Sequence, residues 1–166
     1  MPRPARAVVA GASLAGLRGA QALRDEGFDG ELVVLGAEEH QPYRRPPLSK
    51  ELMAGVTGPE GTDLKEADLE ADLRVGRRIA RLDAPGRAVV MEDGDRVAFD
   101  VLLVATGAEP RRLPDADDRP GVHVLRTLED ALAIREASER AGRVVVVGAG
   151  FIGCEVRPAC ASATSP

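Results

Sequence analysis

The residues whose types and spacing most clearly indicate a binding function form a glycine turn near the start of the chain, Gly11-Ala12-Ser13-Leu14-Ala15-Gly16. Backbone N–H groups at a helix start can bind a pyrophosphate, and the helix dipole favours its negative charge. Ser13 stands at the position of the middle glycine, where a small residue still lets a cofactor approach. By itself the pattern fits both a dinucleotide site and an ordinary glycine-rich turn. The candidate cofactor-binding residues here are Gly11, Ser13, Leu14, Ala15 and Gly16.

The flanking residues supply the elements that such a turn needs. An apolar run at 7–10 predicts a buried strand, and apolar residues at helical spacing over 14–23 predict a helix that ends at Gly27. A second strand over 31–36 completes a β-α-β unit. Glu38 follows at the interval of about 20 residues where a carboxylate would bind ribose hydroxyls. Glu38 and Glu39 are equally compatible with solvated loop acids.

A second glycine turn lies near the other end of the chain, with Gly148, Gly150 and Gly153 in an intact G-x-G-x-x-G pattern. It follows four valines at 144–147 that predict another buried strand. Two strand-plus-glycine units in one chain are a stronger signal than either unit alone. Together they indicate two nucleotide sites.

Composition limits the classes of function. The chain has 166 residues, of which 44% are apolar and 30% charged, as expected for one soluble globular domain. A net charge of -5 with scattered arginines argues against nucleic-acid binding. We expect no membrane span and no secretory signal, because no apolar run approaches about 20 residues. Cys154 and Cys160 form neither a disulfide framework nor a metal set, which predicts a reducing cytoplasm.

Between the two glycine turns, local patterns predict further elements. We expect a rigid proline-rich loop at 42–50, a short acidic helix over 63–73 and a loosely alternating strand over 74–82. After these, the sequence predicts a hairpin with strands over 88–91 and 97–99, an apolar strand over 101–104, and a helix that begins after Thr127 and ends before Gly142.

Three strings together resemble a known family: G-A-S-L-A-G, P-Y-R-R-P-P-L-S-K at 42–50, and A-T-G at 105–107. The chain is similar, from Ala7 to about Val156, to FAD-dependent pyridine nucleotide oxidoreductases of the ferredoxin, rubredoxin and putidaredoxin reductase type. The resemblance implies an α/β fold, with an incomplete Rossmann-like FAD-binding domain containing a β-meander over 1–141. It also implies the first strand and glycine turn of an NAD(P)-binding domain over 142–156, and an aberrant tail over 157–166.

The resemblance also implies cofactors, partners and site residues. FAD and NAD(P)H would be the cofactors, and electrons would pass to a ferredoxin-like [2Fe-2S] protein or rubredoxin that serves an oxygenase or P450. No cysteine pair precedes Cys154, so electrons would leave the flavin for an external carrier. No catalytic acid–base residue and no metal ligand is predicted. The further cofactor-binding residues would be Arg45, Lys50, Ile79, Ala105, Thr106, Gly107, Arg126 and, beside the nicotinamide, Glu155.

The family pattern stops after Val156, where Arg157-Pro158 follows. Proline does not suit a helix interior, so we expect an irregular tail and a reading frame cut short. Weak FAD retention and no reductase turnover by this chain alone are the expected consequences. A non-catalytic adenine-nucleotide-binding fragment, a simple NAD-binding dehydrogenase and a remnant without function remain open alternatives. The short-chain form of the dehydrogenase is disfavoured because Tyr43, the only tyrosine, lacks a lysine four positions later.

Overall fold

The computed structural model describes residues 5–64, 69–114 and 119–163, with side-chain surroundings defined up to Cys160. The chain divides into two compact units. Unit 1 comprises Met1–Tyr43 and Leu64–Gly107, and unit 2 comprises Arg44–Asp63 and Ala108–Pro166. Within the described residues, no helix has both the length and the apolar character needed to cross a membrane.

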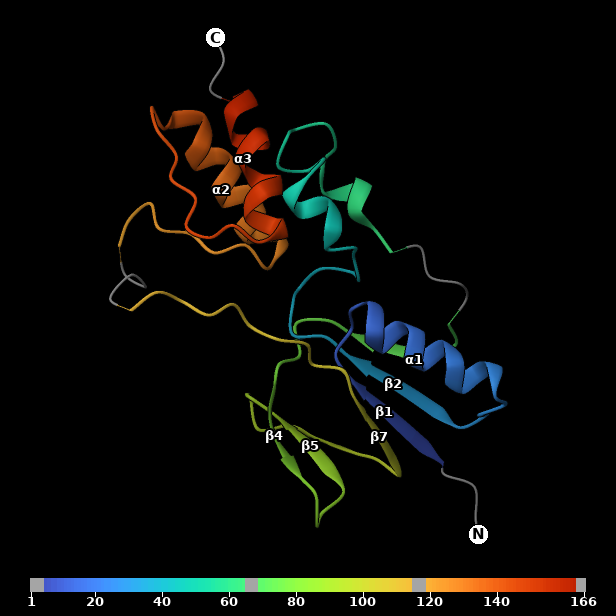
Figure 1. Ribbon diagram of the computed structural model, residues 1–166. Helices are drawn as coiled ribbons and strands as arrows, with labels where there is room; N and C mark the ends of the chain where they lie inside the picture. Colours follow the sequence, from blue (N-terminus) through green and yellow to red (C-terminus); the bar gives the residue numbers. More distant parts are fainter. Residues whose placement is uncertain (1–4, 65–68, 115–118, 164–166) are drawn as a thin grey trace. The chain divides into compact units, whose positions relative to one another are not determined.

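A four-stranded parallel sheet forms the centre of unit 1 (Figure 1). Helix α1 (Leu14–Asp25) connects the first two strands and ends just before Gly27, which has a φ of 82°. The strand order is β3-β2-β1-β7, so β2 and β3 lie on one side of β1, and β7, which comes later in the chain, lies on its other side. The carboxyl ends of β1 and β7 therefore form a topological switch point, where ligands bind in open α/β sheets. The strands are β1 (Arg6–Ala10), β2 (Glu31–Leu35), β3 (Asp72–Arg74) and β7 (Val101–Val104).

The two faces of the parallel sheet carry separate parts of the core. Alternate residues such as Val9 and Val34 pack with Leu17 and Ala20 of α1 on one face. On the other face, Leu35 and its neighbours pack against an antiparallel sheet of order β4-β5-β6. These strands are β4 (Ile79–Asp83), β5 (Ala88–Met91) and β6 (Arg96–Ala98). The predicted α/β fold with a β-meander is confirmed.

Two expectations for unit 1 are wrong. The predicted helix over 63–73 falls partly on 65–68, which lie outside the described residues, and Asp72 and Leu73 belong to β3. The single strand predicted over 74–82 is divided between β3 and β4, with Gly76 at a φ of 66° between them. Pairing of Asp72 with Val33 of β2 gives the acidic segment a sheet partner, and this tertiary contact outweighs its local pattern.

Unit 2 contains two α-helices and two 3₁₀-helices: η1 (Pro46–Ser49), η2 (Pro59–Thr62), α2 (Leu128–Arg140) and α3 (Phe151–Ala163). The predicted start of α2 is confirmed, because Thr127 forms a capping box with Asp130. The segment 42–50 was expected to be a loop throughout, but η1 forms within it. Proline at the first positions of η1 is compatible with a helix start, since it needs no N–H there.

The predicted strand at 144–147 does not form, and these valines are exposed, with Val145 and Val147 at 76% and 74%. Within the described residues they have no ladder partner, which a strand requires. The predicted irregular tail is also wrong, since α3 continues through Pro158 to Ala163. Val156, Ala159 and Cys160 are buried at helical spacing. The stabilisation by this packing outweighs the loss of the backbone hydrogen bond that Pro158 cannot donate.

Asp100 connects the start of β1 to the start of β7 through backbone hydrogen bonds. Its carboxylate accepts the N–H groups of Arg6 at 2.9 Å and Ala5 at 2.7 Å. These bonds, that of Arg6 first, hold the pKa of Asp100 below its ordinary value of 3.8. Because the folded-state pKa is lowered, the stabilisation by Asp100 is complete above this ordinary value. It is lost as the pH falls through the lower folded-state pKa.

We therefore expect Asp100→Asn to lower the thermal midpoint of the chain at neutral pH. The difference from the parent chain should shrink as the pH falls below 3.8, because asparagine cannot titrate. Thermal unfolding followed by circular dichroism from about pH 6 to pH 3 measures this difference. A difference that stays constant over that range would contradict the assignment.

Candidate functional site

The first glycine turn joins three strand ends at the switch point of unit 1. The N–H of Gly11 donates to the Leu35 carbonyl, and the N–H of Ala105 donates to the Ala10 carbonyl, both at 2.8 Å. Gly11 has a φ of 120°, and a Cβ there would lie 2.1 Å from the carbonyl oxygen of Ala105. The predicted residues Ala105 and Gly11 are thus brought into direct contact, with Thr106 exposed immediately after.

The same turn places the start of α1 against the sheet. A Cβ on Gly16 would lie 1.8 Å from the carbonyl oxygen of Gly11, so only glycine allows this approach. Ser13 is the N-cap residue, and its side chain makes no capping hydrogen bond. Leu14 and Ala15 are exposed in the first helical turn, where N–H groups have no acceptor within the helix. Small residues and outward N–H groups fit the pyrophosphate of a dinucleotide.

Glu38 lies beyond the end of β2, on a loop whose backbone is tethered to the residues after β3. The N–H of Gly76 donates to the Glu38 carbonyl at 2.8 Å, and the N–H of Arg77 donates to the Gly36 carbonyl at 2.7 Å. A Cβ on Gly36 would lie 2.8 Å from the Cβ of Ala12, so this loop runs beside the glycine turn. The half-buried Glu38 is therefore near the turn, as its spacing predicts.

Sequence reasoning missed a partner of Glu38. The hydroxyl of Tyr43 donates to Glu38 Oε2 at 2.5 Å, and Tyr43 is only 6% exposed. The other predicted residues of unit 1 lie at strand ends. Ile79 is the first residue of β4 and pairs with Met91, and Gly107 has a φ of 77° after β7.

In unit 2, four of the predicted residues form two contacts, a hydrogen bond to a backbone carbonyl and an ion pair. Arg45 donates to the backbone carbonyl of Arg126, whose own N–H donates to Asp130 at 2.8 Å. Lys50 Nζ lies 3.3 Å from Glu155 Oε1. Arg45 and Lys50 flank η1, so the first contact connects η1 to the residue before the N-cap of α2, and the second connects it to α3.

Ser49 is a second partner that sequence reasoning missed, and it donates to Glu155 Oε2 at 2.5 Å. This hydrogen bond is the main cause that holds the pKa of Glu155 below its ordinary value, and Lys50 adds to it. The only sequence signal was the position of Ser49 beside Lys50. Lys50 and Glu155 therefore form an ion pair whose carboxylate is charged at neutral pH.

The second glycine turn repeats the geometry of the first. Gly148 has a φ of 119°, and a Cβ on Gly153 would lie 2.6 Å from the Gly148 carbonyl oxygen. The N–H of Cys154 donates to the Gly150 carbonyl at 3.0 Å, as the N–H of Leu17 does to the Ser13 carbonyl at 3.0 Å. The turn and its helix α3 therefore form, although the preceding valines pair with no strand among the described residues.

The structure thus brings the predicted residues together in two sets, one in each unit. Unit 1 holds Gly11, Ser13, Leu14, Ala15, Gly16, Glu38, Ile79, Ala105, Thr106 and Gly107. Unit 2 holds Arg45, Lys50, Arg126, Gly148, Gly150, Gly153 and Glu155. Among the described residues, no group of histidine, cysteine and acidic side chains is arranged to hold a metal ion.

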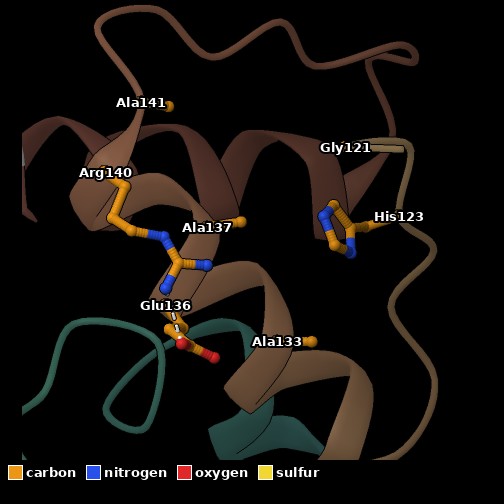
Figure 2. A pocket seen from close by; sticks show the side chains of 7 residues that line it. All are labelled: Gly121, His123, Ala133, Glu136, Ala137, Arg140 and Ala141. Carbon is orange, nitrogen blue, oxygen red and sulfur yellow. Dashed lines mark hydrogen bonds and ion pairs between the residues drawn. The ribbon is translucent and has the colours of Figure 1, made fainter. Parts of the chain in front are cut away.

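Unit 2 also has a shallow hollow of about 450 Å³ between α2 and the segment before it (Figure 2). His123 extends into it from one side, and on the other Arg140 reaches back to Glu136 at 2.6 Å. None of the predicted cofactor-binding residues lines this hollow. Its charged pair is mostly exposed, with both side chains at 68%.

The chain is similar to several known proteins. Residues 5–164 match the family model described as pyridine nucleotide-disulphide oxidoreductase. The chain is 40% identical over 163 residues to the ferredoxin–NAD(+) reductase component of a p-cumate 2,3-dioxygenase system from Pseudomonas putida, covering 96% of this chain and 40% of that protein. It is 42% identical to the corresponding component of a biphenyl dioxygenase system from Paraburkholderia xenovorans, covering 89% of this chain and 37% of that protein.

A solved structure of a covalent putidaredoxin reductase–putidaredoxin complex has a TM-score of 0.87 and 34% identity to the chain, covering 95% of this chain and 40% of that one. The chain therefore spans about 40% of the length of these relatives. Because the family model matches nearly all of it, the chain belongs to the pyridine nucleotide-disulphide oxidoreductase family.

Proposed function

We propose that this chain supplies nucleotide-binding parts of an FAD-dependent reductase that passes electrons from NAD(P)H to a ferredoxin-like carrier. The observation that carries the proposal is the glycine turn at the β1–β7 switch point, where Gly11 contacts Ala105 directly. The backbone from Gly11 to Gly16 would bind the FAD pyrophosphate, and Glu38 would bind its ribose. Ile79, Ala105, Thr106 and Gly107 would be further neighbours of FAD.

When bound, the flavin supplies hydride acceptance from NAD(P)H and release of single electrons to an iron–sulfur carrier. The residues of this chain bind and orient the cofactors. Arg45, Lys50 and Arg126 would contact FAD, with Lys50 held by Glu155 at 3.3 Å. Gly148, Gly150, Gly153 and Glu155 would bind NAD(P)H.

The domain assignment follows from these roles. We infer an incomplete FAD-binding domain over 1–141 and the start of an NAD(P)-binding domain over 142–156. The residues after 156 continue α3 without a break as far as Ala163. A ferredoxin-like [2Fe-2S] protein or rubredoxin is the proposed partner, because the named relatives are ferredoxin–NAD(+) reductase components of dioxygenase systems and a putidaredoxin reductase solved with putidaredoxin. A cytoplasmic location is proposed, because two cysteines on one helix supply no disulfide framework of the kind that secreted domains use.

Titration of the chain with FAD tests the proposal. We expect saturable binding at one FAD per chain, seen as a change in the flavin absorbance bands, and competition by ADP because both ligands share the pyrophosphate and ribose contacts of unit 1. Circular dichroism verifies that the chain is folded. A folded chain that leaves the flavin spectrum unchanged and binds no ADP would contradict the proposal.

Two further results separate the alternatives. Binding of ADP with no change in the flavin bands would favour an adenine-nucleotide-binding protein without redox activity. Anaerobic addition of NADH to the FAD-loaded chain then tests electron transfer. Bleaching of the flavin absorbance would show electron transfer by this chain and contradict the expected lack of turnover, whereas FAD binding without bleaching would agree with a chain that supplies only nucleotide-binding parts of the reductase.

A further inference from the structure

The Tyr43 hydroxyl is a buried polar group with an acidic partner. Its side chain is 6% exposed, and it donates to Glu38 Oε2 at 2.5 Å. A buried hydroxyl requires a hydrogen-bond partner, and bonds to a charged acceptor are about twice as strong as neutral ones. The His40 ring contacts the Tyr43 ring edge-on, with centroids 6.4 Å apart. The phenol is therefore held by packing on one side and by its acceptor on the other.

The backbone places Glu38 without orienting its carboxylate. Hydrogen bonds from Gly76 and Arg77 tether the loop, but they engage carbonyl groups of the main chain only. A glutamate side chain has several rotatable bonds, and ordering it costs conformational entropy. Tyr43 has only two such bonds and is buried. Its hydroxyl donates to the Glu38 carboxylate from a fixed position and so favours one direction of that carboxylate.

We infer that Tyr43 is a positioning residue that orients Glu38 for the ribose of an adenine nucleotide. A carboxylate has about four acceptor positions, so the bond from Tyr43 is compatible with a second bond from a ribose hydroxyl. The orientation exists before the ligand binds, and the ordering cost is then already met by the fold. This inference rests on the proposed function, because it assigns Glu38 to the ribose.

The test is a double-mutant cycle with ADP as the ligand, measured by calorimetry on the full chain. Tyr43→Phe keeps the buried ring and removes only the hydroxyl. We expect it to weaken ADP binding about 3- to 10-fold, which is less than the full value of one hydrogen bond to a charged group, because the hydroxyl orients Glu38 and does not itself contact the ligand. In a Glu38→Ala background, Tyr43→Phe should change the ADP affinity by less than about 2-fold, because the group it orients is gone.

Two controls separate positioning from a general structural effect. Glu39→Gln makes the same type of change one residue away and should leave ADP affinity unchanged. Binding of 2′-deoxy-ADP should fall less with Tyr43→Phe than binding of ADP, since a ribose hydroxyl is missing from the ligand. A purely structural role of Tyr43 would weaken both ligands equally and would persist in the Glu38→Ala background.

A ligand-free measurement is possible because Tyr43 is the only tyrosine and the chain has no tryptophan. A carboxylate that accepts the phenol hydrogen bond quenches tyrosine emission. We expect Glu38→Gln to raise the Tyr43 fluorescence, and Glu39→Gln to leave it unchanged. Equal emission in the parent chain and Glu38→Gln would overturn the Tyr43–Glu38 contact.

The outcomes distinguish this inference from the function on which it rests. If the folded parent chain binds neither ADP nor FAD, the proposed function fails and the inference fails with it. If the parent chain binds ADP and Tyr43→Phe binds it equally well, only the inference fails. Loss of affinity that disappears in the Glu38→Ala background supports both.

Discussion

Replacement of Gly11 by alanine is expected to destabilise the chain by about 3–5 kcal/mol and to abolish ADP binding. Two physical causes add. An L-residue is strained at the Gly11 φ of 120°, and the new Cβ would lie 2.1 Å from the carbonyl oxygen and 2.6 Å from the carbonyl carbon of Ala105. Backbone atoms cannot rotate away as a side chain can. The β1–β7 junction must therefore open, and the first-turn N–H groups lose their alignment.

Gly94→Ala is the matched control for this prediction. Gly94 has a φ of 90° in the turn of the β5–β6 hairpin, and a Cβ there would meet nothing within 4 Å. It therefore carries only the conformational cost, about 1–2 kcal/mol, and should leave ADP binding intact. Urea unfolding followed by circular dichroism gives both free energies. If Gly11→Ala costs no more than Gly94→Ala, the close approach to Ala105 has no energetic role.

Elements that depend on local sequence were predictable. The hairpin follows from Asp93-Gly94 between alternating strands, and α2 follows from Thr127 and Asp130, which form the expected capping box. The glycine turns are local in the same sense. The second one adopts a Gly148 φ of 119°, close to the 120° of Gly11, although residues 144–147 directly before it form no strand. The turn geometry is thus a property of its own short sequence.

Elements that depend on distant partners were not predictable. The valines at 144–147 have strand-forming side chains, but a strand needs a neighbouring ladder, and none pairs with them in the described chain. Asp72 and Leu73 show the opposite case, because an acidic segment becomes a strand where β2 offers an edge. Pro158 is retained within α3 because Val156, Ala159 and Cys160 bury one face of that helix.

The site shows the same division. The positions of Gly11, Gly16 and Glu38 could be predicted because the β-α-β unit fixes their spacing. The hydrogen bonds from Tyr43 to Glu38 and from Ser49 to Glu155 could not, since they depend on how loops and helices fold back. Sequence motifs therefore predict which backbone segment would bind a ligand. The structure adds the side chains of Tyr43 and Ser49, which donate to the carboxylates of Glu38 and Glu155.

Leu35→Ala is expected to destabilise the chain by about 2–5 kcal/mol, as for other fully buried leucines. Leu35 is 1% exposed and packs with Val89, Met91 and Val97, the buried residues that join the β-meander to the parallel sheet. Truncation removes apolar contacts and leaves a cavity between the two sheets. Urea unfolding measures the loss, and Leu35→Met, which conserves volume, should cost less than about 1.5 kcal/mol.

Leu82→Ala is the control, because Leu82 lies on β4 of the same meander but is 50% exposed. It should cost well under half as much as Leu35→Ala, since less apolar surface is lost. The position of Leu35 also connects the core to the site, because its carbonyl accepts the N–H of Gly11 at 2.8 Å. A cavity at Leu35 should therefore weaken ADP binding even in molecules that remain folded, whereas Leu82→Ala should not. Equal ADP affinity in folded Leu35→Ala would show that the glycine turn holds its geometry without support from the core beneath it.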